Sequence, residues 1–225
     1  GADLQPFLSA QPLSREEFGF NKEDILVVYM GRIAPEKNLE FLLQAFAGVS
    51  RAVPNTKLLI VGGGQKEHEE GIKDFANEIG LDDCVKFTGA VAYAKLPSYL
   101  SMCDIFATAS VTEVHPFSVI EGMATGLPIL GIDSPGISDS ISDGETGLLS
   151  ADDLASYTAK LTTLCLNKDL QKKMGAAAQQ AARQFSIENT TTIMLGHYNR
   201  LVSNTKPVKP SIEERLRSVL KEFLV

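Results

Sequence analysis

The sequence predicts a doubly wound, Rossmann-like α/β domain with a six-stranded parallel sheet, and two features of the sequence lead to this fold class. Six short apolar runs, rich in branched residues, recur along the first two thirds of the chain and are typical of buried strands. Helical patterns lie between these runs. Because strand and helix alternate in this way, we expect the strands to run parallel, with helices covering both faces of the sheet.

The predicted strands and helices follow one another in a regular order. The strands are expected at residues 25–30, 58–61, 84–87, 105–107, 128–132 and 147–149. After the first strand and the possible cap Asn38, apolar residues follow the spacing of an amphipathic helix at Leu39, Leu42, Leu43, Phe46 and Val49. Residues 152–202 have a helical pattern throughout. Ligands of such folds gather at the carboxyl ends of the strands, so the segments that follow the strands are the candidate site.

The end of the chain differs in pattern from the rest. Residues 203–210 form a short polar stretch that contains prolines, which is typical of a linker. Residues 211–225 then carry an apolar stripe at helical spacing, made of Ile212, Leu216, Val219, Leu220 and Phe223. We therefore divide the chain into a ligand-binding domain at 1–202, a linker at 203–210 and an amphipathic helix at 211–225.

The composition excludes several classes of protein. A formal charge of −7 and a pI near 5.1 oppose binding to a nucleic acid or to an anionic membrane surface. The three cysteines form no C-x-x-C pair, and the histidines lack the i, i+4 spacing of a metal site, so we expect neither a disulfide framework nor a metal ion. No apolar run reaches the ~18 residues that span a bilayer. These features predict a protein of the reducing cytoplasm.

Two glycine-containing segments follow the first two predicted strands. Gly31 and Arg32 come directly after the first strand, and Lys37 follows shortly after. Two permanent cations beside a glycine suit the binding of a diphosphate. Two solvated cations on the protein surface explain this segment equally well. Gly62, Gly63 and Gly64 follow the second strand, where backbone N–H groups could hold phosphate oxygens. Their spacing matches neither a dinucleotide-binding fingerprint nor a P-loop.

The segment from Glu113 to Glu121 is the most informative part of the sequence. Pro116 suits the first position of a helix, so the N–H groups at the helix start, those of Phe117, Ser118 and Val119, are expected to point toward an anion. Glu113 precedes this helix and Glu121 lies about one turn inside it. Carboxylates accept hydrogen bonds from adjacent hydroxyls, so the pair suits a sugar; each alone is explained by the helix dipole.

A turn-rich segment follows the fifth predicted strand. Residues 133–149 contain the turn signals Pro135-Gly136 and Asp143-Gly144. Such a segment is expected to form a loop that could close over a ligand.

Taken together, these segments resemble the retaining glycosyltransferase family 4, whose members have the two-domain GT-B fold. Residues 31–37 are similar to the family's G-R-x-x-x-E-K-N segment, and Glu113 and Glu121 match its E-x7-E motif. Residues 122–128 and 143–149 also follow the family pattern, although His115 and Pro116 stand where many members have Phe-Gly. The resemblance covers residues 1 to about 202 and is specific because several motifs occur in order.

The resemblance implies that this chain is the donor-binding half of an enzyme that moves a sugar from a UDP- or GDP-linked donor with retention. It implies that Arg32 and Lys37 hold the diphosphate, Glu113 the sugar and Glu121 the ribose. The backbone from His115 to Val119, with Gly31, Gly62 and Gly63, would line the donor. The resemblance also implies a missing partner, the family's acceptor-binding domain, and only that domain could contact a membrane. Without it the chain would be inactive, and the helix at 211–225 would lack the surface that covers it.

Other functions remain open on the sequence alone. The family's mechanism needs no cofactor, and the absence of a D-x-D sequence disfavours the metal-dependent glycosyltransferase fold. A GT-B epimerase or phosphorylase would use a related site, but nothing marks a pyridoxal phosphate lysine. A non-catalytic module that senses a nucleotide sugar or binds a partner would use the same fold, because fold alone does not fix function. The presence of Arg32, Lys37, Glu113 and Glu121 together favours an enzyme.

Overall fold

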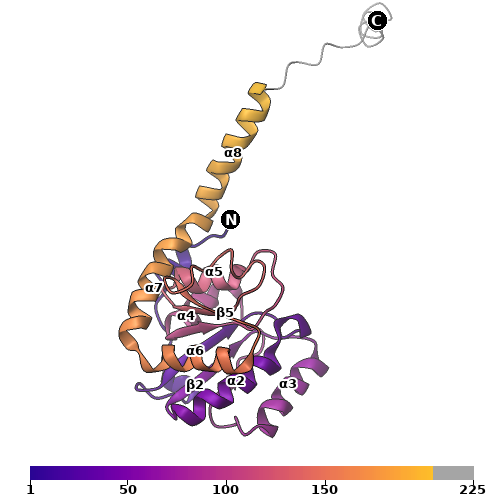
Figure 1. Cartoon of the computed structure of the whole chain (residues 1–225), viewed down its shortest axis with the longest axis vertical. Helices are drawn as coiled ribbons and strands as arrows, with labels where there is room; N and C mark the ends of the chain where they lie inside the picture. Colours follow the sequence, from indigo (N-terminus) through magenta and orange to yellow (C-terminus); the bar gives the residue numbers. More distant parts are fainter. Residues whose placement is uncertain (205–225) are drawn as a thin grey trace, which may run out of the picture.

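A computed structural model describes residues 1–204 and contains the expected parallel sheet (Figure 1). The strands lie in the order β3-β2-β1-β4-β5-β6, and each neighbouring pair is parallel. This order, with its reversal beside β1, is that of a doubly wound nucleotide-binding fold, so the predicted fold class is confirmed. The strands are β1 (Ile25–Met30), β2 (Thr56–Val61), β3 (Val85–Phe87), β4 (Ile105–Ala107), β5 (Ile129–Ile132) and β6 (Gly147–Ser150).

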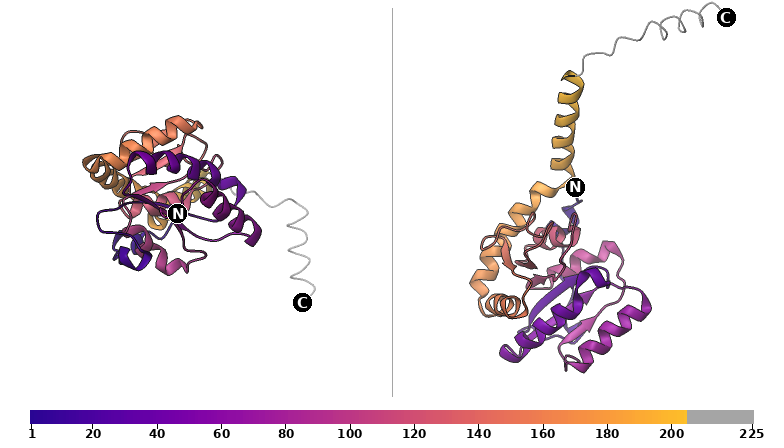
Figure 2. Two further views of the ribbon diagram at one scale, coloured as in Figure 1. Left: turned by 90° about the horizontal axis from the view of Figure 1, so that it is seen from below. Right: turned by 45° about the vertical axis from the view of Figure 1, so that its right-hand side comes forward.

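Helices connect the strands and cover both faces of the sheet (Figures 1 and 2). The α-helices are α1 (Gln5–Leu8), α2 (Leu39–Ala52), α3 (Lys66–Glu78), α4 (Leu96–Ser101), α5 (Phe117–Ala124), α6 (Leu154–Leu166), α7 (Lys168–Ala182) and α8 (Ile187–Asn204). Short 3-10 turns are η1 (Arg15–Phe18), η2 (Pro35–Lys37), η3 (Tyr93–Lys95) and η4 (Arg183–Phe185). Asn38 precedes α2 as expected, but its side chain makes no capping hydrogen bond.

The alternation of side chains along the strands divides the core into two clusters. In β1, Ile25, Val27 and Tyr29 pack with α2, α3 and α6 on one face of the sheet. Leu26, Val28 and Met30 pack with α1, α4 and α5 on the other face. Every residue of β1 is buried, which explains why this strand is a continuous apolar run in the sequence.

The first and last described segments meet at one point of the domain. The Ala2 N–H donates to the Phe185 carbonyl, and the Ile187 N–H donates to the Ala2 carbonyl, both at 2.9 Å. From this point α8 extends away from the body of the domain (Figures 1 and 2). It continues through Ser203 and Asn204, two residues beyond the expected start of the linker, because neither residue breaks a helix. The rest of the linker and the 211–225 stripe lie outside the described residues.

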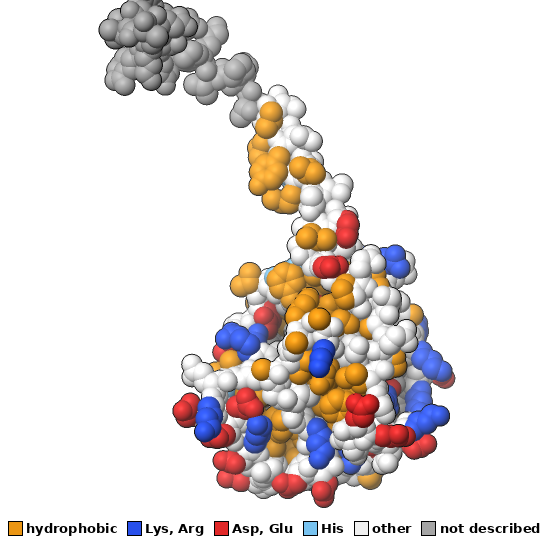
Figure 3. All heavy atoms as spheres, turned by 180° about the vertical axis from the view of Figure 1, so that it is seen from behind, with side chains coloured by type: hydrophobic (Ala, Val, Ile, Leu, Met, Phe, Trp, Pro, Cys, Tyr) orange, Lys and Arg blue, Asp and Glu red, His pale blue; other side chains and the backbone are white. Residues whose placement is uncertain are grey.

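Helix α8 exposes a set of large apolar side chains. Figure 3 shows apolar atoms along this helix and on the adjoining surface of the domain. The exposed fractions rise from about half at the start of the helix to three quarters at its end, over Ile187, Ile193, Met194, Leu195, Tyr198, Leu201 and Val202. Contiguous exposed apolar surface of this kind is uncommon on a monomeric soluble protein.

Glycine 62 is required by the packing of the loop after β2 against the loop after β1. Its φ is +130°, and an added Cβ would overlap the Gly31 carbonyl oxygen. We expect Gly62→Ala to lower the free energy of unfolding by at least about 1–3 kcal/mol, the usual cost of such a backbone conformation. Chemical denaturation measures this change. Gly71→Ala is the matched control, because Gly71 lies in α3 with no atom near its added Cβ, and this variant should be neutral or stabilising.

Candidate nucleotide-sugar site

A small cavity at the carboxyl edge of the sheet collects most of the residues that the sequence marked. It has a volume of about 210 Å³ and lies between the end of β1, the end of β4 and the start of α5. Its lining includes the predicted residues Gly31, Arg32, Lys37, Glu113, His115, Pro116, Phe117 and Ser118. Val119, Glu121, Gly62 and Gly63 do not line this cavity. The fold therefore brings together segments that lie about eighty positions apart in the chain, as shown by the Lys37 to Glu113 contact.

Lys37 and Glu113 contact each other directly in this cavity. The Lys37 Nζ donates to Glu113 Oε1 at 2.5 Å, and each side chain is 17% exposed. An ammonium group has three donors, so Lys37 retains hydrogen-bonding capacity for an anion while it holds Glu113. The pair thus places a positive charge and an oriented carboxylate beside the start of α5.

Arg32 lies on the open side of the cavity. Its side chain is 76% exposed and pairs with Glu36 at 2.8 Å, one helical turn away in η2. Because exposed pairs of this kind contribute little free energy, the guanidinium can exchange Glu36 for a ligand at small cost. The loop backbone is held instead by Tyr29, whose hydroxyl donates to the Arg32 carbonyl at 2.8 Å. Burial, and then the charges of Glu113 and Glu36, raise the pKa of Tyr29, so this hydroxyl keeps its proton.

The start of α5 presents unpaired N–H groups to the cavity. Pro116 is the N-cap residue, so the helix begins within one residue of the expected position. The Phe117 and Val119 N–H groups donate to the His115 and Pro116 carbonyls, whereas those of His115 and Ser118 make no hydrogen bond within residues 1–204. The positive end of the helix dipole acts at the same place. This helix start therefore offers an anion two free donors beside Lys37.

The triglycine segment has a different local role from a phosphate cradle. The Gly62 N–H donates to the Gly89 carbonyl, and the Gly64 N–H donates to Glu69 Oε2 at 3.2 Å. Added Cβ atoms at Gly62 and Gly64 would overlap the Gly31 and Ile33 carbonyls. The absence of side chains therefore lets this loop lie against residues 31–33. Of the three glycines, Gly63 keeps an N–H group without a hydrogen bond in the described part of the chain.

Glu121 is buried next to the cavity and is held by a residue that the sequence reasoning missed. Its residue surface is 5% exposed, and its Oε1 accepts a hydrogen bond from the Tyr93 hydroxyl at 2.6 Å. Burial raises the pKa of Glu121, and the Tyr93 hydrogen bond opposes that rise. The available signal for Tyr93 was its position in the loop after β3, at the edge of the sheet where ligands bind.

The loop at residues 133–146, which leads into β6, supports Glu113 from the other side. The Glu113 N–H donates to the Pro135 carbonyl at 3.3 Å, and the Gly136 backbone, with φ of +81°, packs so closely that an added Cβ would overlap the Glu113 carbonyl. The side chains of Ile137 and Ser140 are buried beneath this loop. The turn-rich segment is therefore a packed wall of the Glu113 region.

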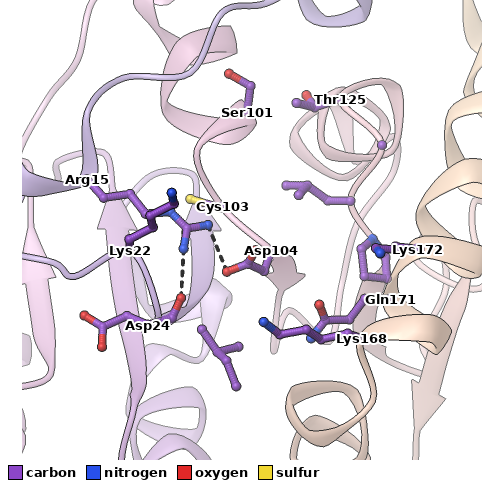
Figure 4. Close-up of a pocket in the computed structure, with 14 residues that line it drawn as sticks. Arg15, Lys22, Asp24, Ser101, Cys103, Asp104, Thr125, Lys168, Gln171 and Lys172 are labelled. Atoms are coloured by element: carbon purple, nitrogen blue, oxygen red, sulfur yellow. Dashed lines mark hydrogen bonds and ion pairs between the residues drawn. The ribbon is translucent and has the colours of Figure 1, made fainter.

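A second cavity, of about 430 Å³, lies at the opposite edge of the sheet, where β1, β4 and β5 begin (Figure 4). Arg15 donates to the Asp104 carboxylate and to the Asp24 carbonyl, and Lys22, Lys168 and Lys172 are exposed around it. None of the predicted site residues lines it. Within residues 1–204, no cluster of metal-binding side chains is present, and no helix combines the length and hydropathy of a membrane span.

The strand order and the cavity at the carboxyl edge define a class of protein, the doubly wound α/β domains with a cavity at the switch point of a parallel sheet. The chain belongs to the family of glycosyl transferases group 1, whose model matches residues 10–181. This assignment confirms the family resemblance drawn from the motifs.

Individual relatives agree with this family. The chain is 29% identical to the D-inositol 3-phosphate glycosyltransferase of Gordonia bronchialis over 213 residues, which cover 91% of this chain and 46% of that protein. It is similar in structure to sucrose-phosphate synthase from Thermosynechococcus elongatus (TM-score 0.79, 24% identity, 91% of this chain and 52% of that chain). Anabaena HepE in complex with UDP-glucose is also similar (TM-score 0.75, 22% identity, 90% and 56%). The chain thus spans about half the length of each of these three proteins.

Proposed function

We propose that this chain is the donor-binding half of a retaining glycosyltransferase that uses a UDP- or GDP-linked sugar. The observation that carries the proposal is the arrangement of Lys37, Glu113 and the free N–H groups of α5 around one cavity at the carboxyl edge of the sheet. Cations and a helix start suit a diphosphate, while carboxylates suit sugar hydroxyls. The UDP-glucose bound by HepE is a ligand of this chemistry on a similar fold.

In this proposal the site promotes transfer mainly by stabilising the leaving group. As the bond from the anomeric carbon to the diphosphate breaks, negative charge grows on the diphosphate oxygens. Arg32, Lys37 and the positive end of α5 interact more strongly with that charge than with the intact donor, which lowers the barrier. In this proposal these groups, rather than a divalent metal or other cofactor, stabilise the leaving group. Glu113, held by Lys37, would fix the transferred sugar through its hydroxyls.

We also propose that a second domain completes the enzyme and carries the acceptor. The chain spans about half of its relatives, and its first residues and α8 leave the domain at the same point, beside Ala2 and Ser186. The exposed apolar side chains of Ile187, Ile193, Met194, Leu195 and Tyr198 in α8 suit a partner surface, and a domain attached at this point would lie near them. The closed cleft would exclude water and align the acceptor hydroxyl with the anomeric carbon.

Two conservative substitutions test the assignment of sugar and ribose to separate carboxylates. We expect Glu121→Gln to weaken free nucleoside diphosphate and nucleotide sugar alike, by about tenfold or more, because it removes a charged acceptor from a buried site. Glu113→Gln should weaken only the nucleotide sugar. It should leave the affinity for the free diphosphate unchanged or slightly higher, because it removes a negative charge that competes with the diphosphate for Lys37.

Isothermal titration calorimetry with the free diphosphate and its sugar conjugate separates these effects. Glu78→Gln is the matched control, since Glu78 is an exposed residue at the end of α3 and should change neither affinity. An equal loss of free diphosphate binding in the Glu113→Gln and Glu121→Gln variants would show that the two carboxylates do not divide the ligand in this way.

A further inference from the structure

The contact between Tyr93 and Glu121 is unusual because an exposed side chain reaches a buried carboxylate. Tyr93 is 57% exposed, yet its hydroxyl lies 2.6 Å from Oε1 of Glu121, which is 5% exposed. The other carboxylate oxygen, Oε2, makes no hydrogen bond within residues 1–204. Tyr93 therefore lies between Glu121 and the solvent. The Oε2 atom of Glu121 remains available to accept a hydrogen bond from a ligand.

The ring of Tyr93 is held in place from the amino-terminal segment. It packs edge-on against Phe7 of α1, with ring centroids 6.1 Å apart and an interplanar angle of 71°. Phe7 is almost fully buried and belongs to the core on that face of the sheet. Because Phe7 restricts the ring, the hydroxyl has a defined direction toward Glu121, as expected of a side chain that orients another group.

We propose that Tyr93 is a positioning residue of the nucleotide site, whose hydroxyl fixes the Glu121 carboxylate so that it discriminates the ribose diol of the donor. This inference rests on the proposed function, in which Glu121 holds the ribose. An ionised carboxylate offers about four lone-pair directions, of which Tyr93 uses one. Because the Tyr93 hydrogen bond stops the carboxylate from rotating, its remaining lone pairs point in fixed directions and can accept hydrogen bonds from two adjacent hydroxyls. A carboxylate held in this way selects a diol better than a carboxylate that rotates.

The same contact influences the ionisation of Glu121. Burial raises the pKa of Glu121 and the Tyr93 hydrogen bond lowers it, so removing the hydroxyl should raise the pKa further. Burial raises the pKa of Tyr93, and Glu121 and then Asp3, which precedes α1, raise it further. From α7, the neutral Gln179 amide donates to the Ala124 carbonyl of α5. Hydroxyl groups bind the ionised carboxylate best, so nucleotide affinity should fall as pH decreases through the pKa of Glu121. In Tyr93→Phe this fall should begin at a higher pH.

The test compares Tyr93→Phe with wild-type protein in calorimetric titrations of UDP, 2′-deoxy-UDP, GDP and 2′-deoxy-GDP. The wild-type protein should prefer the ribonucleotide of the base it binds by about ten- to a hundredfold, the usual effect of a hydrogen bond to a charged group. Tyr93→Phe should reduce this ratio by at least about threefold and shift the acidic limb of the pH profile upward. The control is Tyr99→Phe, because Tyr99 is a half-buried tyrosine of α4 whose hydroxyl donates no hydrogen bond in the described residues.

The possible outcomes separate this inference from the function on which it rests. A strong ribose preference in the wild-type protein that persists unchanged in Tyr93→Phe, with an unchanged pH profile, would overturn the role of Tyr93 and leave the proposed function intact. No binding of any nucleoside diphosphate to the wild-type protein would overturn both. Equal melting temperatures of the two proteins would show that a reduced ratio arises at the site rather than from loss of folding.

Discussion

The 225-residue chain alone is expected to bind its nucleoside diphosphate sugar and to transfer no sugar at a measurable rate. The sheet and its two buried clusters give the domain its own core, so folding and donor binding do not require another domain. Sugar transfer does require a second domain, because without it the anomeric carbon would face solvent on one side and no acceptor would be aligned with it. Correct alignment of two reactants contributes roughly 7–11 kcal/mol to catalysis, so its loss removes most of the rate.

The measurement is an assay of the purified chain with radiolabelled donor and a broad mixture of acceptors, in which both transfer and donor hydrolysis are followed. A full-length member of the family with a known acceptor serves as the positive control for the assay. Multiple-turnover transfer by this chain alone would mean that the catalytic site is complete within it, and the half-enzyme proposal would then fail.

Lys37→Ala is expected to lose affinity for a nucleoside diphosphate by about ten- to a hundredfold while its affinity for the uncharged nucleoside stays the same. A charge-assisted hydrogen bond is worth roughly 1.5–3 kcal/mol, which gives the expected range. The substitution also removes the 2.5 Å partner of Glu113, so that an unpaired carboxylate faces the diphosphate and adds to the loss.

Calorimetry with both ligands measures the two affinities. Lys66→Ala is the matched control, because it also breaks a lysine to glutamate pair, but at the exposed start of α3, where Lys66 is 81% exposed. It should leave both affinities unchanged. A similar loss for nucleoside and diphosphate in Lys37→Ala would place Lys37 outside the phosphate region.

The fold was predictable because each strand has a clear local signal. The strands β1 and β4 begin and end at the expected residues, since their side chains are buried on both faces and form uninterrupted apolar runs. The start of β2 lies two residues before the expected one, because Thr56 and Lys57 are polar and precede the apolar run. The local hydrophobic pattern thus predicts the succession of strands and helices along the chain better than it predicts where each strand begins and ends.

The candidate site was predictable only at the level of segments. The rule that ligands bind at strand ends brought residues 31–37 and 113–121 to one place, and the cavity there contains most of the marked residues. The direct pairing of Lys37 with Glu113 and of Tyr93 with Glu121 depends on side-chain geometry across distant segments, for which the sequence has no periodic signal. The packing role of Gly62 and Gly64 was missed for the same reason.

A thermal-shift panel of UDP, GDP and ADP, each alone and as its sugar conjugate, tests the central claim that this chain is a nucleotide-sugar-binding domain. One nucleoside diphosphate should stabilise the domain by roughly 2.7 kcal/mol at a concentration 100 times its Kd. Its sugar conjugate should stabilise the protein further at the same concentration, because Glu113 adds contacts to the sugar. If none of these ligands raises the melting temperature at millimolar concentration, the chain does not bind a nucleotide sugar and the account is wrong.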